Sequence, residues 1–294
     1  MINYFCDVII FALNGRSDST VATATTWLNL ISARNVRAKV VLFLIGNENC
    51  NNDWIRSYLD RKIIHKLFIV YDADVVDEID VFQWPLGPAL YRRFPSGSIG
   101  PSDARSKRKY VCNLMVTVYP NSSRERLVKI IEDHGLEKDC YVQTRDSWPS
   151  HEDSGVVDAY RAILLDSDLT LCPVGYNAES YRIYEAAASG SVPVIEDRIG
   201  IAGGCRTSRS ETASNSNGQR SIRIHSPPLT LLKYYEAPFI YVRDWSELVR
   251  IVAKERELSV ERKAERRRRL LEWYAKFGTQ IKEHFVRVIS DETE

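Results

Sequence analysis

Three charged residues at three-residue spacing give the clearest chemical signal in the chain: Glu179, Arg182 and Glu185. On a helix, this spacing places side chains on one face. A guanidinium there can bind a diphosphate through paired hydrogen bonds, and a carboxylate one turn further can accept bonds from the hydroxyls of a ribose. The alternative is an ion-pair network on a solvated helix face, which stabilises a helix very little. We favour nucleotide binding, because a short apolar strand follows this helix directly and neighbouring elements should cover both.

The segments around these residues predict how they are positioned. Residues 169–172 form an apolar run with the length of a buried strand, and it ends at Pro173 and Gly175. Asn177 is a predicted helix N-cap, and an alanine-rich helix is expected from there to residue 189. Gly190 stands where a left-handed C-cap is expected.

A second apolar strand is predicted over residues 192–195, so the whole segment has the strand, turn, helix, strand order of a parallel sheet. In such sheets, ligands bind at the carboxyl ends of the strands, where helix N-termini favour anions. We therefore expect a nucleotide diphosphate to bind here. The predicted binding residues are Pro173, Gly175, Tyr181, Arg182, Glu185 and Gly190.

Two series of alternating strands and helices organise the 294-residue chain. In the first series, strands are predicted at 7–13, 38–45 and 67–71, with helices at 19–33 and 53–59. Prolines and glycines then interrupt the pattern to about residue 109. The second series has strands at 110–119 and 140–143, helices at 123–134 and 154–165, and then the segment described above. This order predicts an α/β protein of two Rossmann-like lobes, the glycosyltransferase-B architecture.

The predicted domains are an N-terminal lobe with its linker at 1–108, a nucleotide-sugar-binding lobe at 109–258, and a C-terminal amphipathic helix at 259–294. Residues 205–226 are polar and read as a mobile insertion. Forty basic and thirty-nine acidic residues give a net charge of +1, which argues against nucleic acid as a partner.

Six cysteines lack the spacing of a metal site. Cys112, Cys140 and Cys172 each lie in an apolar run, where a disulfide and a buried thiol are equally natural. The sequon that begins at Asn121 fits a lumenal protein, but the same residues can also cap a helix. Neither feature decides the compartment.

Several sequence motifs identify a family resemblance. The order L-C-P-x-G, Y-R-x-x-E-A and G-x-V-P-V-I resembles the nucleotide-sugar half of exostosin-type glycosyltransferases. The longer runs DVFQWPLG at 80–87, LLDSDLTLCPVG at 164–175 and YRIYEA at 181–186 are similar, more narrowly, to the ribitol-5-phosphate xylosyltransferase family of animals. The similarity extends from about residue 7 to about residue 289, and runs of this length are far more specific than a single glycine motif.

The resemblance implies an inverting transfer of xylose from UDP-xylose to ribitol 5-phosphate on the phosphorylated O-mannosyl glycan of α-dystroglycan, with a β1,4-linked product. It also implies a type II Golgi membrane protein with a lumenal catalytic part, associated with fukutin and fukutin-related protein. The first predicted strand begins at residue 7, so we expect that the start of the N-terminal, acceptor-binding lobe is truncated and that the anchor precedes this sequence. Two alternatives stay open: an exostosin-like transferase using UDP-glucuronic acid or UDP-N-acetylglucosamine, and a catalytically silent scaffold.

An inverting transferase needs a carboxylate to take the proton of the acceptor hydroxyl. Glu48, Asp72 and Asp74 follow predicted strands of the first lobe and are the candidate bases. Acidic residues are also common in such loops for other reasons. Asp72 and Asp74 have the D-x-D spacing with which other glycosyltransferases hold a divalent metal, but they lie far from Arg182 in sequence. We therefore expect no bound metal and no required cofactor.

Overall fold

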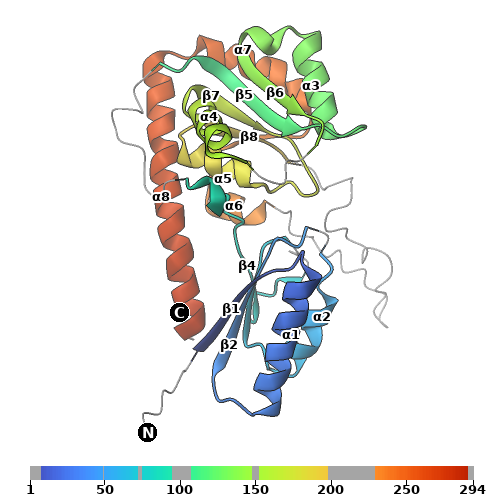
Figure 1. Cartoon of the computed structure of the whole chain (residues 1–294). Helices are drawn as coiled ribbons and strands as arrows, with labels where there is room; N and C mark the ends of the chain where they lie inside the picture. Colours follow the sequence, from blue (N-terminus) through green and yellow to red (C-terminus); the bar gives the residue numbers. More distant parts are fainter. Residues whose placement is uncertain are drawn as a thin grey trace, which may run out of the picture. The chain divides into compact units, whose positions relative to one another are not determined.

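The computed structural model describes residues 8–48, 50–71, 75–94, 107–147, 152–197 and 229–290 (Figure 1). These residues form two compact units. Unit 1 contains the described residues up to Leu86, together with residues 229–231 and those from His284 onward. Unit 2 contains the described residues from Gly87 to 197 and from Leu232 to Glu283. Each unit holds its own parallel sheet, so the expectation of two Rossmann-like α/β lobes is confirmed.

The sheet of unit 1 has its strands in chain order. The strands are β1 (Val8–Asn14), β2 (Lys39–Ile45), β3 (Lys66–Ile69) and β4 (Val81–Gln83), all paired in parallel. The helices of this unit are α1 (Asp18–Ala33) and α2 (Asp53–Asp60). Right-handed crossovers that advance in one direction place their helices on one face of a sheet. A second covering element is therefore needed on the other face.

Successive side chains of β2 point to opposite faces of the sheet and show how each face is covered. Leu42 and its alternate neighbours pack with Leu28 of α1 and Ile55 of α2. Phe43 points to the opposite face, where its ring centroid lies 5.3 Å from that of Phe285. Phe285 belongs to the last turns of α8 (Val260–Ser290), the long predicted amphipathic helix. Full burial of each large apolar side chain in these layers contributes about 1.5–3 kcal/mol.

The sheet of unit 2 has the strand order β6-β5-β7-β8-β9, again all parallel. The strands are β5 (Tyr110–Thr117), β6 (Cys140–Arg145), β7 (Ser167–Cys172), β8 (Val192–Glu196) and β9 (Ile240–Val242). The helices are α3 (Ser123–Asp133), α4 (Ser154–Leu165), α5 (Tyr181–Ala188) and α7 (Leu248–Glu257). The short helix α6 (Thr230–Tyr234) begins in unit 1 and ends in unit 2. The chain runs outward from β5 to β6 and then returns past β5 to β7. The strand order thus reverses between β5 and β7.

Helices cover both faces of this second sheet, because the chain reverses direction. On one face, Leu114 of β5 belongs to a core that includes Leu127 of α3 and Leu248 of α7. On the other face, Met115 packs with Leu164 of α4 and Ala186 of α5.

Polar residues set where several of these helices begin. The hydroxyl of Ser122 accepts a bond from the backbone N–H of Glu125 at the start of α3 (3.2 Å). The carboxylate of Asp153 accepts from Val156 at the start of α4 (2.9 Å). Asp244 forms a capping box at the short 3₁₀ turn Trp245–Glu247 that leads into α7.

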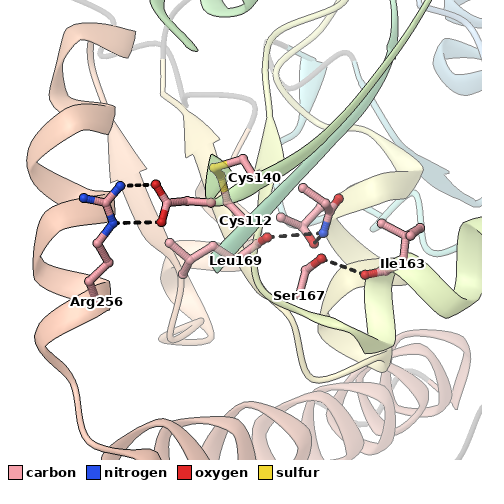
Figure 2. Close-up of a disulfide and its surroundings, with 9 residues drawn as sticks. Cys112, Cys140, Ile163, Ser167, Leu169 and Arg256 are labelled. Atoms are coloured by element: carbon pink, nitrogen blue, oxygen red, sulfur yellow. Dashed lines mark hydrogen bonds and ion pairs between the residues drawn. A yellow bond between two sulfur atoms is a disulfide. The ribbon is translucent and has the colours of Figure 1, made fainter. Parts of the chain in front are cut away.

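A disulfide joins Cys112 of β5 to Cys140 of β6, which are register partners in the sheet (Figure 2). Next to it, the side chain of Arg256 in α7 forms a paired ion contact with Asp139. Cys172 at the end of β7 is a free, buried thiol, and burial raises its pKa to about 12. The sequence left both states open for these cysteines. In the structure, Cys112 and Cys140 form a disulfide and Cys172 is a free thiol.

Two sequence predictions need correction. Helix α5 begins at Tyr181 with Ser180 as its N-cap, not at Asn177, because residues 176–180 form a loop with Asn177 and Ala178 buried in it. Strand β4 was not predicted, since a strand of only three residues gives little periodic signal.

The unit boundary also differs from the expected domain limit at residue 108. Ala89 and Arg92 bind the carboxylate of Glu185, so residues from Gly87 onward pack within unit 2. The predicted insertion at 205–226 lies outside the described residues.

Candidate nucleotide-sugar site

The reversal of strand order between β5 and β7 marks the place where open α/β sheets bind ligands. Strand β5 pairs with β7 only as far as Asn113, whereas it continues beside β6 to Thr117. The carboxyl end of β5 therefore separates from β7. The loop that contains Gly175 begins at the carboxyl end of the neighbouring strand β7.

Glu196, at the carboxyl end of β8, fixes the start of this loop. Its Oε2 accepts bonds from the backbone N–H of Val174 (3.0 Å), the indole of Trp245 (2.9 Å) and the hydroxyl of Ser123. The carboxylate is buried. One acidic side chain thus connects the Gly175 loop to the start of α3.

Gly175 itself leaves space for a guanidinium. A Cβ atom at this position would lie 2.6 Å from Nη2 of Arg124, the second residue of α3. Arg124 is held by a bond from Nη1 to the carbonyl oxygen of Thr117 (2.9 Å). The close approach of this arginine is a local reason for glycine at position 175.

Arg182 lies on the first turn of α5, at the same edge of the sheet. Its Nη2 donates to the carbonyl oxygen of Met115 in β5 (2.5 Å). Its Nε is buried and has no hydrogen-bond partner among the described residues, and the same holds for the hydroxyl of the adjacent N-cap Ser180. Buried donors without partners are costly, so the first turn of α5 carries two donors suited to an anion.

Glu185, one turn after Arg182, is fully buried. Its carboxylate accepts bonds from the Arg92 guanidinium (2.9 and 3.2 Å), the Tyr160 hydroxyl (2.6 Å) and the backbone N–H of Ala89 (3.3 Å). Burial is the main cause, and the negative charge of Glu185 the second, that raises the pKa of the Tyr160 hydroxyl well above its usual value. The tyrosine consequently remains a proton donor to this carboxylate.

Arg92 links Glu185 to a second buried carboxylate, that of Glu152. It forms a second, two-pronged ion pair with Glu152 (2.9 and 3.0 Å), which also accepts from Arg145 (3.2 Å). Burial opposes ionisation of Glu152, but the bonds from Arg92 and Arg145 outweigh it and lower the pKa of this carboxyl. Glu185 therefore lies inside a structural charge network.

The other predicted donor residues occupy different surroundings. Pro173 is buried at the end of β7, and Tyr181 is half-buried as the first residue of α5. Gly190 lies at the opposite, amino edge of the sheet, with φ at +65° and a Cβ position 2.8 Å from Cγ of Arg267. Glu179 precedes α5 and accepts from the Tyr184 hydroxyl. The structure therefore brings Pro173, Gly175 and Arg182 to one edge and separates Gly190 from them.

Of the three candidate bases, the structure describes only Glu48, since Asp72 and Asp74 lie outside the described residues. Glu48 follows β2 at the carboxyl edge of the sheet in unit 1. Its carboxylate pairs with Arg16, which follows β1 (2.6 Å). Its assignment as a base stays a prediction.

Sequence reasoning missed Arg124, Glu196 and Arg92. Each gains its place from a partner far away in the chain, such as Gly175 for Arg124 and Glu185 for Arg92. A weak signal existed for Arg124, because it directly follows a predicted helix cap after a predicted strand.

Two family models match this chain. The RXYLT1 N-terminal domain matches residues 2–85, and the RXYLT1 C-terminal domain matches residues 91–293. Among solved structures, an α1,3-fucosyltransferase aligns over 100% of this chain and 93% of its own, with 8% identity and a TM-score of 0.43.

Two curated relatives align with nearly the whole of this chain. Ribitol-5-phosphate xylosyltransferase 1 of Danio rerio is 43% identical over 97% of this chain and 63% of its own length. The protein of the same name from Homo sapiens is 41% identical over 96% of this chain and 61% of its own length. The chain thus spans about three fifths of the length of these relatives. Because the C-terminal domain alone matches more than half of the sequence, the chain belongs to the RXYLT1 family.

Proposed function

We propose that this chain is a UDP-sugar-dependent glycosyltransferase that transfers xylose from UDP-xylose to ribitol 5-phosphate. The observation that carries the proposal is Arg182, placed with an unsatisfied buried donor at the β5/β7 switch point of unit 2. The names of the relatives support the choice of donor sugar and acceptor.

In the proposed reaction, an acceptor hydroxyl attacks the anomeric carbon of xylose as the bond from that carbon to the β-phosphate oxygen breaks. A carboxylate takes the hydroxyl proton, and UDP leaves with the bonding electrons. Attack from the face opposite UDP inverts the anomeric centre, in keeping with a β1,4-linked product. Arg182 would stabilise the negative charge that develops on the departing diphosphate.

The candidate bases are Glu48, Asp72 and Asp74. Removing a general base typically lowers turnover by about 10²–10⁴-fold. We expect one of the variants Glu48→Gln, Asp72→Asn and Asp74→Asn to lose turnover on that scale while its KM for UDP-xylose changes little. A small loss in all three would remove them from the proposal.

Glu185 was predicted to bind the ribose. Its two oxygens already accept four hydrogen bonds from unit 2. Binding to a ribose would require exchange of one of these partners. Comparing UDP with 2′-deoxy-UDP tests this, since equal affinities for the two would argue against a contact to the 2′-hydroxyl.

We further propose that no divalent metal is required, with arginine supplying the positive charge that a metal would otherwise provide. Activity should therefore persist in EDTA. The wider setting is also proposed from the resemblance: the O-mannosyl glycan of α-dystroglycan as acceptor, a lumenal Golgi location, and association with fukutin and fukutin-related protein. The Cys112–Cys140 disulfide favours an oxidising compartment. Among the described helices, none combines the length and apolar character needed to cross a membrane.

A panel of radiolabelled UDP-sugars tests the function. The protein is incubated with ribitol 5-phosphate and UDP-xylose, UDP-glucuronic acid or UDP-N-acetylglucosamine. We expect transfer from UDP-xylose alone. Transfer only from another sugar would support an exostosin-like enzyme of different specificity, and UDP binding without any transfer would support a scaffold.

A further inference from the structure

We propose that Arg124, which lies against the Gly175 loop, is a second diphosphate-binding residue that acts together with Arg182. This inference rests on the proposed function, because it concerns the same donor site. It assigns a ligand contact to a residue that the sequence did not single out.

The first support is the way both arginines use strand β5. Beyond Asn113, β5 no longer pairs with β7, and two carbonyl oxygens near its end accept bonds from guanidinium groups. Met115 accepts from Arg182 (2.5 Å), and Thr117 accepts from Arg124 (2.9 Å). One arginine comes from α5 and the other from α3, so two helices place positive charge at the same opened strand end.

The second support is the position of Arg124 relative to Gly175. Nη2 of Arg124 lies where a side chain at residue 175 would begin, at 2.6 Å from the Cβ position. The guanidinium therefore lies directly against the loop that was predicted to contact the diphosphate. A guanidinium has five N–H donors, so a bond to a backbone carbonyl is compatible with bonds to phosphate oxygens.

The third support is the role of Glu196. Its carboxylate binds the hydroxyl of Ser123 and the backbone N–H of Val174, which directly precede Arg124 and Gly175. This buried acid thus fixes the arginine and the loop relative to each other. Glu196 is a positioning residue in this account, since its bonds go to the protein.

The chemistry suits a diphosphate better than a single phosphate. Two guanidinium groups supply two positive charges, and they approach from two separate helices, α3 and α5. The two phosphate groups of UDP can then be bound by one arginine each. The loss of Arg124 should consequently affect ligands in proportion to their number of phosphates.

Calorimetric titration with UDP, UMP and uridine tests this inference on the whole chain. The variants are Arg124→Ala, Arg124→Lys and Arg126→Ala. Arg126 serves as the matched control, because it lies on the same helix and pairs with Asp244 at the surface (2.7 Å). Thermal melts are recorded to check that each variant is folded.

We expect Arg124→Ala to weaken UDP binding about 10- to 100-fold, the range for hydrogen bonds to charged groups, with a smaller effect on UMP and none on uridine. Arg124→Lys should recover part of the affinity, and Arg126→Ala should bind as the unaltered protein does. Unchanged UDP affinity in Arg124→Ala, or equal losses for all three ligands, would overturn the inference and leave the proposed function intact. Failure of the unaltered protein to bind UDP would overturn both.

Discussion

The two sheets of this protein are built from the same strand and helix alternation but differ in strand order. In unit 1, the described strands follow chain order from β1 to β4. In unit 2, the order reverses between β5 and β7. Only at a reversal do neighbouring strands send their connections to opposite faces, which opens a crevice at the carboxyl edge. Strand order, more than composition, therefore explains why the candidate donor site lies in unit 2.

The cores of the units differ as well. The face of the first sheet that packs against α8 is aromatic, with Phe43 stacked on Phe68 at 4.7 Å and with Phe285 beside both. The corresponding region beneath the donor site in unit 2 contains the ionic group of Arg92, Glu152 and Glu185. An aromatic cluster tolerates the loss of one contact better than a buried ion pair, which leaves an unpaired charge when one partner is removed.

The largest expected effect is a loss of stability in unit 2 when its buried ionic group is broken. Arg92→Met leaves two buried carboxylates without their main partner and should destabilise unit 2 by about 3–5 kcal/mol. Arg268→Met is the matched control, because Arg268 pairs with Glu265 and Glu272 on the exposed side of α8, and its loss should change the stability very little. Urea unfolding followed by hydrogen exchange would assign each loss to a unit. If Arg92→Met lowered the stability of both units equally, the assignment of this ionic group to unit 2 alone would be contradicted.

The disulfide should come next in size. It closes a loop with a sequence separation of 28, for which the chain-entropy relation gives roughly 3–4 kcal/mol. Replacing Cys112 and Cys140 together with alanine should lower the unfolding free energy of unit 2 by about this amount. Cys172→Ala, at the free buried thiol, provides the comparison. Equal stability of the double variant and the unaltered protein would show that the bond contributes nothing.

A smaller effect is expected on binding. Arg182→Ala should weaken UDP affinity about 10- to 100-fold, since it removes charge-assisted hydrogen bonds to the diphosphate. Arg16→Ala, which alters the carboxyl edge of unit 1, should leave UDP affinity unchanged. If Arg16→Ala weakened UDP binding and Arg182→Ala did not, the donor site would have to be assigned to the first sheet.

The smallest expected effect concerns acid stability. The folded-state pKa of Glu152 lies below its usual value, so its contribution is fully present above the unfolded pKa and is lost as the pH falls through the folded pKa. Unit 2 should thus lose stability below about pH 4.5. Glu152→Gln should flatten this part of the profile. An unchanged slope in that variant would assign the acid sensitivity to other groups.

Local signals made most elements predictable. The bounds of α4, predicted at residues 154–165, follow from its polar cap at Asp153 and its apolar spacing. The start of α5 was not predictable, because Asn177 and Ser180 both suit an N-cap and only tertiary packing chooses between them. The partners of Arg92 and Arg124 depend on which strands become neighbours, and no local pattern carries that information.

The central claim is that a nucleotide diphosphate binds at the β5/β7 edge of unit 2. A crystal structure of the protein with UDP bound tests it most directly. The account predicts diphosphate density beside Gly175, within hydrogen-bond distance of the Arg182 guanidinium. Density for UDP at the carboxyl edge of the first sheet, or with Arg182 still bound only to the Met115 carbonyl, would contradict it.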